Sequence, residues 1–276
     1  MIEIKDFVLE WKEDIRNFIK ENHVNLKLAI VQVGNNSASN TYVKGKIKDC
    51  LEVGMDYSHI QLPETISQID FDKKIKEINE DSSVNGIIVQ LPLPKTLKLN
   101  LDLISDEKDV DGFKPSSKFT PCTPLGIMTF LEKNEINIEG KNCVVIGRSD
   151  IVGKPMANLL MNKNGTVTIC HSKSKNIEQF TKHADIIIVA TGHRHTLTKD
   201  MIDKNNPIII DVGINRNEEG KLCGDCDYYD LVEKCSYISP VPGGVGLLTR
   251  CALLQNMINT MSWIIFSQDT IELINY

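Results

Sequence analysis

The fold of this chain is constrained most by a regular alternation between short, β-rich apolar runs and longer segments with helical periodicity. In the first half, strands are predicted at 26–33 and 55–62 and after Gly86, with helices at 37–53 and 67–80 between them. The third strand ends before Pro92 and Pro94, because proline has no backbone N–H to donate to a sheet. Strand–helix alternation requires crossover connections, and it therefore predicts βαβ units with a parallel sheet.

The second half repeats the alternation and predicts another α/β region. The segment 106–124, DEKDVDGFKPSSKFTPCTP, is rich in Asp, Lys, Ser and Pro and lacks apolar periodicity, so we predict an interdomain linker there. The apolar run 247–266 predicts a long buried helix, and the spacing over 4–21 predicts an amphipathic surface helix rather than a secretory signal. A further helix is predicted near 124–134, and strands at 142–146, 166–170, 185–190 and 207–212.

Charge and cysteine content argue against several classes of protein. The formal net charge of −6 argues against general nucleic-acid binding, because the chain lacks the excess of Lys and Arg that phosphate contacts require. No apolar run approaches the length of a membrane span, so we expect no membrane partner. Most of the eight cysteines lie in apolar segments, which indicates buried thiols in a reducing cytoplasm.

Two sequence features suggest a metal site, but neither is complete. Cys223 and Cys226 have C-x-x-C spacing without a second pair, and they lie in a segment predicted to be a turn and a short strand. His193 and His195 in TGHRHTL lack an evident third ligand. We therefore predict no metal site and assign the thiols a structural role.

The segment VVIGRSDIVGKP, residues 144–155, predicts the strand, tight turn and helix of a dinucleotide site. Gly147 permits the turn, and the free N–H groups at the start of the helix favour a phosphate. The motif departs from G-x-G-x-x-G, because Ser149 and Val152 replace two glycines and Gly153 comes one position late. Taken alone, the stretch also fits a plain βα turn.

The next predicted strand, TVTIC, indicates which dinucleotide is bound. Sites that prefer NAD carry Asp or Glu at the end of this second strand, where the carboxylate binds the ribose 2′-hydroxyl. This chain has His171-Ser172-Lys173 there. A hydroxyl and a basic group there, with Arg148 on the neighbouring loop, suit a 2′-phosphate. We therefore predict NADP rather than NAD. Downstream, VATG ends another strand at Gly192, as close contact with a dinucleotide would require.

Tyr42 and Lys46 stand four residues apart in a predicted helix and therefore share one face. Alone, this spacing is typical of a solvated surface pair. Short-chain dehydrogenases also use Tyr-x-x-x-Lys, but there the pair follows the glycine-rich turn, whereas here it precedes the turn. The order of the motifs therefore argues against that class.

Several longer motifs occur together in one order: GNNSASNTYVKGK, VQLPLP, KDVDGF, PCTPLGI, GRSDIVGKP, DVGIN and PVPGGVG. In this combination they resemble the methylenetetrahydrofolate dehydrogenase/cyclohydrolase family. The resemblance implies an α/β folate-binding domain over 1–117, completed by a C-terminal helix at 250–276. It also implies a Rossmann-like, parallel-sheet NADP domain over 118–249, a cleft between the two domains, and a homodimer.

The resemblance further implies roles for individual residues. Lys46 is expected to be the catalytic lysine of the cyclohydrolase step, with Gln90 as its hydrogen-bond partner. Tyr42 is expected to pack against the folate ring and Asp111 to hold the pterin, so both also belong to the substrate site. The other positions are expected to bind NADP (Gly147, Arg148, Ser149, Ser172, Gly192 and Ile214) or to flank the folate (Pro242, Gly243 and Gly244).

The predicted protein is a cytoplasmic enzyme of one-carbon metabolism and purine biosynthesis. It would oxidise 5,10-methylenetetrahydrofolate with NADP and hydrolyse the product to 10-formyltetrahydrofolate. The alternatives are a monofunctional NAD(P)-dependent dehydrogenase and a non-catalytic NADP-binding regulator. Lys46 argues against the first, and the presence of Tyr42, Gln90 and Asp111 beside it argues against the second.

The sequence departs from the family's usual pattern at several places. Gly45 occupies a position often held by serine, and Leu247 follows PVPGGVG where proline is usual. The connection between Gly112 and Pro121 is shorter than usual, and TGHRHT replaces a more common lysine–proline turn. These departures bear on kinetics and folate affinity more than on the class of reaction.

Overall fold

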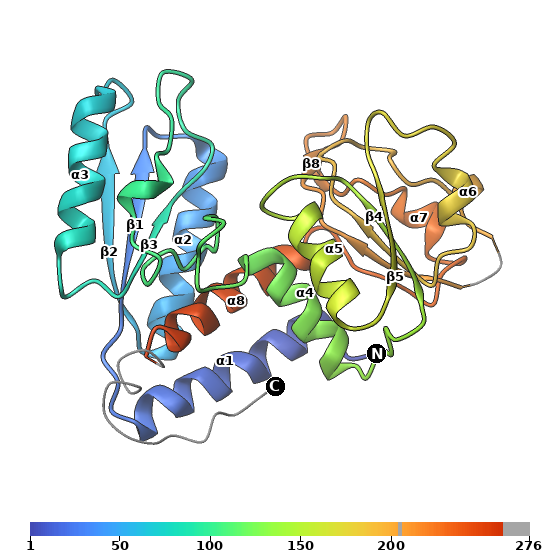
Figure 1. Ribbon diagram of the computed structural model, residues 1–276, viewed down its shortest axis with the longest axis horizontal. Helices are drawn as coiled ribbons and strands as arrows, with labels where there is room; N and C mark the ends of the chain where they lie inside the picture. Colours follow the sequence, from blue (N-terminus) through green and yellow to red (C-terminus); the bar gives the residue numbers. More distant parts are fainter. Residues whose placement is uncertain (204–205, 262–276) are drawn as a thin grey trace. The chain divides into compact units, whose positions relative to one another are not determined.

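Figure 1 shows the computed structural model of the chain, which describes residues 1–203 and 206–261. The chain divides into two compact units. Among the described residues, the N-terminal unit consists of Glu10–Cys122 and 250–261, and the central unit consists of Met1–Leu9, 123–203 and 206–249. The helices α1 (Ile4–Glu21) and α8 (Val245–Asn259) contribute residues to both units.

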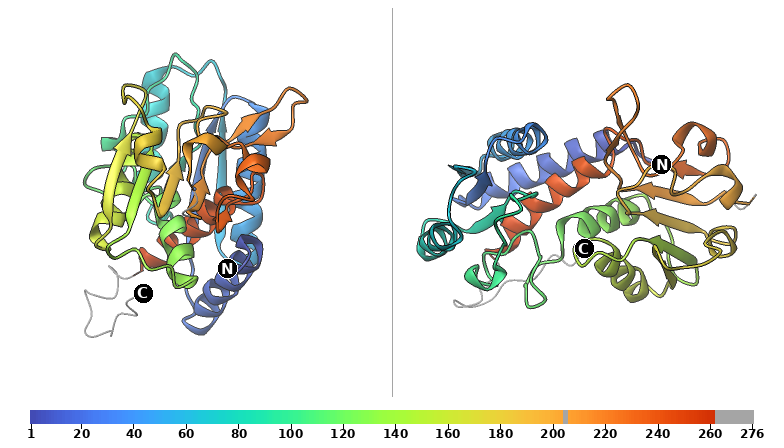
Figure 2. Two further views of the ribbon diagram at one scale, coloured as in Figure 1. Left: turned by 90° about the vertical axis from the view of Figure 1, so that its right-hand side faces the viewer. Right: turned by 90° about the horizontal axis from the view of Figure 1, so that it is seen from above.

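The N-terminal unit is built on a three-stranded parallel sheet with the strand order β2-β1-β3. Parallel crossovers are right-handed, and the two crossovers here run in opposite directions along the sheet. The two helices that form them therefore lie on opposite faces of the sheet (Figures 1 and 2). The elements are β1 (Lys27–Val33), α2 (Ser37–Val53), β2 (Asp56–Leu62), α3 (Gln68–Glu80), β3 (Gly86–Val89) and the 3₁₀ turn η1 (Leu101–Leu103).

Local sequence determines both ends of α2, the helix that carries Lys46. At its start, Oδ1 of Asn36 accepts hydrogen bonds from the N–H groups of Ala38 and Ser39, at 3.0 and 3.1 Å. Such an N-cap satisfies backbone donors that have no partner within the helix. At its end, Gly54 adopts a left-handed φ of +82° and closes the last turn.

The central unit contains a five-stranded parallel sheet in the order β10-β7-β6-β4-β5. The chain passes from β4 to β5 on one side and then returns to β6 on the other, so the direction of winding reverses beside β4. The strands are β4 (Asn142–Ile146), β5 (Thr166–Cys170), β6 (Ile186–Val189), β7 (Ile208–Asp211) and β10 (Tyr237–Ile238). A separate antiparallel pair is formed by β8 (Asn215–Arg216) and β9 (Leu222–Cys223).

Helices cover both faces of this sheet, and successive strand residues point to opposite faces. On one face, α4 (Cys122–Lys133) and α5 (Gly153–Asn162) pack on side chains such as Val145 and Ile188. On the other face, residues of α7 and the connecting segments pack on Val144 and Ile187. Figures 1 and 2 show these layers. The smaller elements are α6 (Glu178–Thr181), η2 (Lys199–Met201) and α7 (Tyr228–Leu231).

The predicted α/β class and the two parallel sheets are confirmed, and α1, β4 and β5 have the predicted bounds. The chain passes from the N-terminal unit to the central unit within the predicted linker 106–124, between Cys122 and Thr123, but most of that segment is packed rather than extended. Asp109, Val110 and Phe119 are buried, and the carboxylate of Asp109 accepts the N–H of Lys114 at 2.8 Å. As far as Pro121, the segment lacks periodicity because it packs as irregular loop structure within the N-terminal unit.

Residues 1–9 are grouped with the central unit, where the rings of Phe7 and Phe130 lie 5.7 Å apart and the N–H of Ile2 donates to Asn134. One further expectation differs from the structure. The helix expected over 247–266 begins at Val245 and ends at Asn259. Residues 262–276 of the expected C-terminal helix lie outside the described residues. Across the described residues, no helix combines the length and apolar character needed to cross a membrane.

The cysteines provide a test of the packing. All eight are free and six are buried, and burial raises the pKa of Cys50 to about 12 and that of Cys143 to about 11. Alkylation requires an accessible thiolate, so we expect iodoacetamide at about pH 8 to modify only the two partly exposed thiols of the native protein, Cys223 and, more slowly, Cys235, whose pKa is also raised by burial. Peptide mass spectrometry before and after unfolding in urea measures this. Labelling of the buried thiols at the unfolded rate would contradict the packing described.

Candidate active site

In the N-terminal unit, the structure brings Lys46 and Gln90 together. Lys46 lies on α2, one turn after Tyr42, and its Nζ donates a hydrogen bond to Oε1 of Gln90 at 3.2 Å. Gln90 directly follows β3 and is held on both sides, since its backbone N–H donates to Val31 at 2.8 Å and its Nε2 donates to the carbonyl of Leu91 at 2.8 Å. The lysine is therefore oriented by an amide at the end of a buried strand.

Asp111 and Tyr42 are each influenced by burial and by a different cation. Burial raises the pKa of the Asp111 carboxyl, and the positive charge of Lys46 acts in the opposite direction. Burial likewise raises the pKa of Tyr42, against the charge of Arg250. Lys46 is thus close enough to Asp111 for its charge to act on the carboxyl, and Arg250 is close enough to act on the phenol.

The irregular segment that carries Asp111 is held by Asn256 of α8, a residue that the sequence analysis did not identify. Nδ2 of Asn256 donates to the carbonyls of Val110 and Thr120, each at 2.9 Å, so one buried side chain closes the segment at both ends. Gly112 between them has a φ of +71°. The sequence could have indicated Asn256, because it is a polar residue within the apolar helical segment LLQNMI, and a buried amide needs hydrogen-bond partners.

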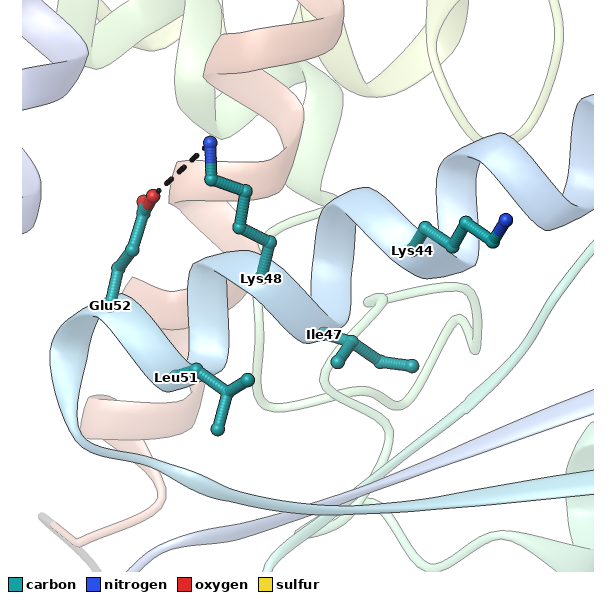
Figure 3. A pocket seen from close by; sticks show the side chains of 5 residues that line it. All are labelled: Lys44, Ile47, Lys48, Leu51 and Glu52. Atoms are coloured by element: carbon teal, nitrogen blue, oxygen red, sulfur yellow. Dashed lines mark ion pairs between the residues drawn. The ribbon is translucent and has the colours of Figure 1, made fainter.

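A shallow hollow lies on another face of α2 (Figure 3). Its lining includes the apolar side chains of Ile47 and Leu51, together with Lys48 and Glu52, which form an ion pair at 3.5 Å along the helix. By the helical repeat, these positions face away from Lys46. The hollow is therefore separate from the residues that carry the predicted chemistry.

In the central unit, the turn after β4 needs two glycines. A Cβ on Gly147, whose φ is +133°, would lie 2.2 Å from the carbonyl oxygen of Ala190. A Cβ on Gly153 would lie 2.3 Å from the carbonyl oxygen of Gly147. The glycine that comes one position late in the motif is thus the one that packs against the turn. Oγ of Ser149 accepts the N–H groups of Val152 and Gly153 at 3.2 and 3.3 Å, and so caps the start of α5.

Arg148 and Ser172 follow the ends of two neighbouring strands. Ile146 of β4 pairs with Cys170 of β5, and the N–H of Gly147 donates to the carbonyl of Cys170 at 2.8 Å. Both side chains are exposed at the same edge of the sheet. The winding reverses at this edge, which is where parallel α/β sheets bind their ligands.

The loops that carry Gly192 and Ile214 are joined by a buried carboxylate that the sequence analysis missed. Asp225 accepts the backbone N–H groups of Thr191 and Gly192, at 2.7 and 2.9 Å, and the side-chain amide of Asn215 at 2.8 Å. Ile214 itself is 48% exposed. The buried carboxylate thus holds two strand-end loops in one arrangement. The sequence around Asp225 has no periodic pattern that indicates this role.

A second buried carboxylate, Asp211 at the end of β7, supports the first. It accepts the N–H groups of Gly213 and Asp225, both at 2.9 Å. Burial raises its pKa, while these hydrogen bonds lower it. The sequence could have indicated this role, because the apolar strand IIID ends in an aspartate, and a buried charge requires partners.

The loop Pro242–Gly244 lies in the central unit and leads into α8. Gly243 has a φ of +96°, and a Cβ on Gly244 would lie 2.2 Å from the carbonyl oxygen of Pro240. Both glycines are therefore required by the backbone. Within residues 1–203 and 206–261, His, Cys, Asp and Glu side chains form no group of three that could hold a metal ion.

A parallel sheet with a glycine turn at its reversal point defines the central unit as a Rossmann-like, dinucleotide-binding type. The catalytic-domain model of tetrahydrofolate dehydrogenase/cyclohydrolase matches residues 2–111, and the NAD(P)-binding-domain model of the same family matches residues 121–264. The chain therefore belongs to the tetrahydrofolate dehydrogenase/cyclohydrolase family.

Individual relatives agree with this assignment. The bifunctional protein FolD of Agathobacter rectalis is 45% identical over 94% of this chain and 95% of its own length. The crystal structure of the bifunctional FolD enzyme from Campylobacter jejuni superposes with a TM-score of 0.90 at 43% identity, covering 95% of this chain and 98% of that one. The Trypanosoma brucei enzyme, solved with NADP and an inhibitor, has a TM-score of 0.86 at 29% identity, covering 95% of each chain.

The Asp225 contacts lead to a testable expectation. Asp225→Asn places an N–H₂ group among the donors that the carboxylate accepts, so we expect unfolding free energy to fall by about 1–3 kcal/mol. Affinity for the dinucleotide should fall with it, because the loops of Gly192 and Ile214 lose their common anchor. Urea unfolding and isothermal titration measure the two effects. Asp227→Asn, at a partly exposed carboxylate paired with His195, is the control; equal losses in both variants would contradict this role.

Proposed function

We propose that this chain oxidises 5,10-methylenetetrahydrofolate to the 5,10-methenyl compound with NADP, and then hydrolyses that compound to 10-formyltetrahydrofolate. Membership of the dehydrogenase/cyclohydrolase family supports both reactions. The structural observation that carries the proposal is the hydrogen bond from Nζ of Lys46 to Gln90, one helical turn from Tyr42. This contact distinguishes Lys46 from a solvated surface lysine, because the amide of Gln90 at the end of β3 orients its amine.

The central unit fits NADP by its own geometry. The turn of Gly147 would lie beside the pyrophosphate at the start of α5, and Arg148 and Ser172 would hold the 2′-phosphate at the same sheet edge. The loops of Gly192 and Ile214 would contact the remainder of the dinucleotide. When bound, NADP supplies the acceptor for the hydride of the folate. The resulting cation is stabilised by two nitrogens, so the protein needs to position the reactants rather than remove a proton.

Hydrolysis makes a different demand, because a water molecule must lose a proton and a folate nitrogen must gain one. Lys46 is the group we assign to these proton transfers. Gln90 accepts from its Nζ and so limits the directions in which the amine can point. Tyr42 would pack on the folate ring, and Asp111 would accept hydrogen bonds from the pterin. We assign Pro242–Gly244 of the central unit to the folate as well.

We also propose that the folate side is formed by the expected domain 1–117 with its C-terminal helix, and the NADP side by 118–249. A homodimer is supported by β2, which forms an edge of its sheet and leaves backbone groups for another strand. Tyr57 on that strand and Leu51 on α2 are exposed apolar side chains nearby in sequence. Free, mostly buried thiols favour the cytoplasm, and a net charge of −6 argues against nucleic acid as a partner.

Lys46→Ala separates the two reactions. We expect cyclohydrolase activity to fall by about 10²–10⁴-fold, the usual contribution of a general acid–base group, while dehydrogenase activity stays within about tenfold of wild type. Spectrophotometric assays of each half-reaction measure this. Lys44→Ala, an exposed lysine on the opposite side of α2, is the matched control. Full cyclohydrolase activity in Lys46→Ala would refute the assignment; a wild type inactive in both reactions would refute the function.

Arg148→Ala tests the cofactor. Removing a charge-assisted contact to the 2′-phosphate should weaken NADP binding by about ten- to a hundredfold and leave NAD binding nearly unchanged. Dissociation constants from fluorescence titration give the comparison. Lys154→Ala removes a cation from α5 that already pairs with Asp150 at 2.5 Å, and it should alter neither. Equal losses for NADP and NAD would show that Arg148 does not select the phosphate.

A further inference from the structure

Gly45 lies inside α2, directly before Lys46, although glycine is among the poorest helix formers. Its backbone shows no left-handed φ that would demand glycine. A Cβ at this position would instead lie 2.0 Å from Nη1 of Arg250 and 3.1 Å from its Cζ. The guanidinium of Arg250 therefore occupies the space where any other residue at position 45 would place its side chain.

The guanidinium lies beside a buried carboxylate. Nε of Arg250 forms an ion pair with Oδ2 of Asp49 at 2.9 Å without a hydrogen bond between the two atoms, and Lys12 of α1 pairs with the other oxygen of the same carboxylate. Asp49 is 1% exposed, so the two cations supply the charge compensation that burial requires. If Arg250 moved away from Gly45, the buried carboxylate of Asp49 would lose one of its two cations.

Arg250 also lies beside the predicted chemistry. Gly45 and Asp49 share a helical face with Tyr42, and the charge of Arg250 acts on the Tyr42 phenol. Farther along α8, Asn256 holds both ends of the segment that carries Asp111. One helix thus contacts the face that bears Lys46 and the loop that bears Asp111.

We propose that Arg250 is a positioning residue for Tyr42 and Lys46, and that the missing side chain at Gly45 is what admits it. The inference rests on the proposed function for the roles of Lys46 and Asp111. Arg250 and Asn256 together fix the distance between α2 and the Asp111 segment. A shift of Arg250 would move the lysine relative to a bound folate, and misplacements of about 1 Å can reduce turnover by about a hundredfold.

A double-mutant cycle between Gly45→Ser and Arg250→Met tests the inference. In the wild-type background, Gly45→Ser should displace the guanidinium and lower cyclohydrolase kcat by about tenfold or more, with KM for the methenyl compound changed less. In the Arg250→Met background, which already has low kcat, the same serine should cause no further loss. Arg250→Lys keeps the charge but not the planar fork, and should recover kcat only in part.

Thermal unfolding gives a second measurement that does not depend on activity. Gly45→Ser should lower the melting temperature of the wild type, because the buried carboxylate loses a partner. In the Arg250→Met background it should raise the melting temperature by roughly 2 °C, since serine favours the helix over glycine and nothing obstructs it. Lys44→Ser, one residue earlier and exposed, is the control for the helical effect.

The outcomes separate the two levels of the proposal. Equal effects of Gly45→Ser in both backgrounds, in kcat and in melting temperature, would overturn the coupling to Arg250. If Gly45→Ser changed the melting temperature differently in the two backgrounds but left kcat unchanged in the wild-type background, the positioning role would be overturned. A wild type inactive in both half-reactions would overturn the proposed function, while the melting temperatures would still test the contact.

Discussion

Parallel pairing of strands is the constraint on which the rest of this structure depends. Because every strand of a parallel sheet runs in the same direction, the loops after the strands gather at one edge. In the N-terminal unit, this constraint places Gln90 after β3 at the same edge as the start of α2, within reach of Lys46. In the central unit, it places Arg148 beside Ser172 after the paired strands β4 and β5. Both candidate sites follow from crossover geometry.

Buried carboxylates then hold the loops in place. Asp225 joins the segments of Gly192 and Asn215, and Asp211 supports Asp225 from the end of β7. Asp49 plays a comparable part in the other unit, where it pairs with cations from two other helices. A buried negative charge without partners is strongly unfavourable, so each of these residues restricts the loops or helices around it to one arrangement. The glycines beside them follow from the same close packing.

The helix α8 connects these effects within the N-terminal unit. Through Asn256 it closes the segment of Asp111, and through Arg250 it contacts the turn of α2 that precedes Lys46. A substitution in α8 can therefore change the geometry of residues that it does not touch. The departure at Gly45, which first suggested only a change in kinetics, has a structural partner in Arg250.

The sequence by itself determined the longer helices and strands, because hydrophobic periodicity, N-caps and glycine C-caps act over a few residues, but it did not indicate short elements such as α6, α7 and β10. It also determined the nucleotide turn, and motif order alone was sufficient to indicate the family. Only the tertiary structure decided which distant groups meet, such as Arg250 with Asp49 and Asn256 with the carbonyl of Val110. It also decided that the irregular segment around Asp111, which leads to the boundary between the two units, is packed. These contacts join segments far apart in the chain through single polar side chains, and such pairings leave no periodic signal in the sequence.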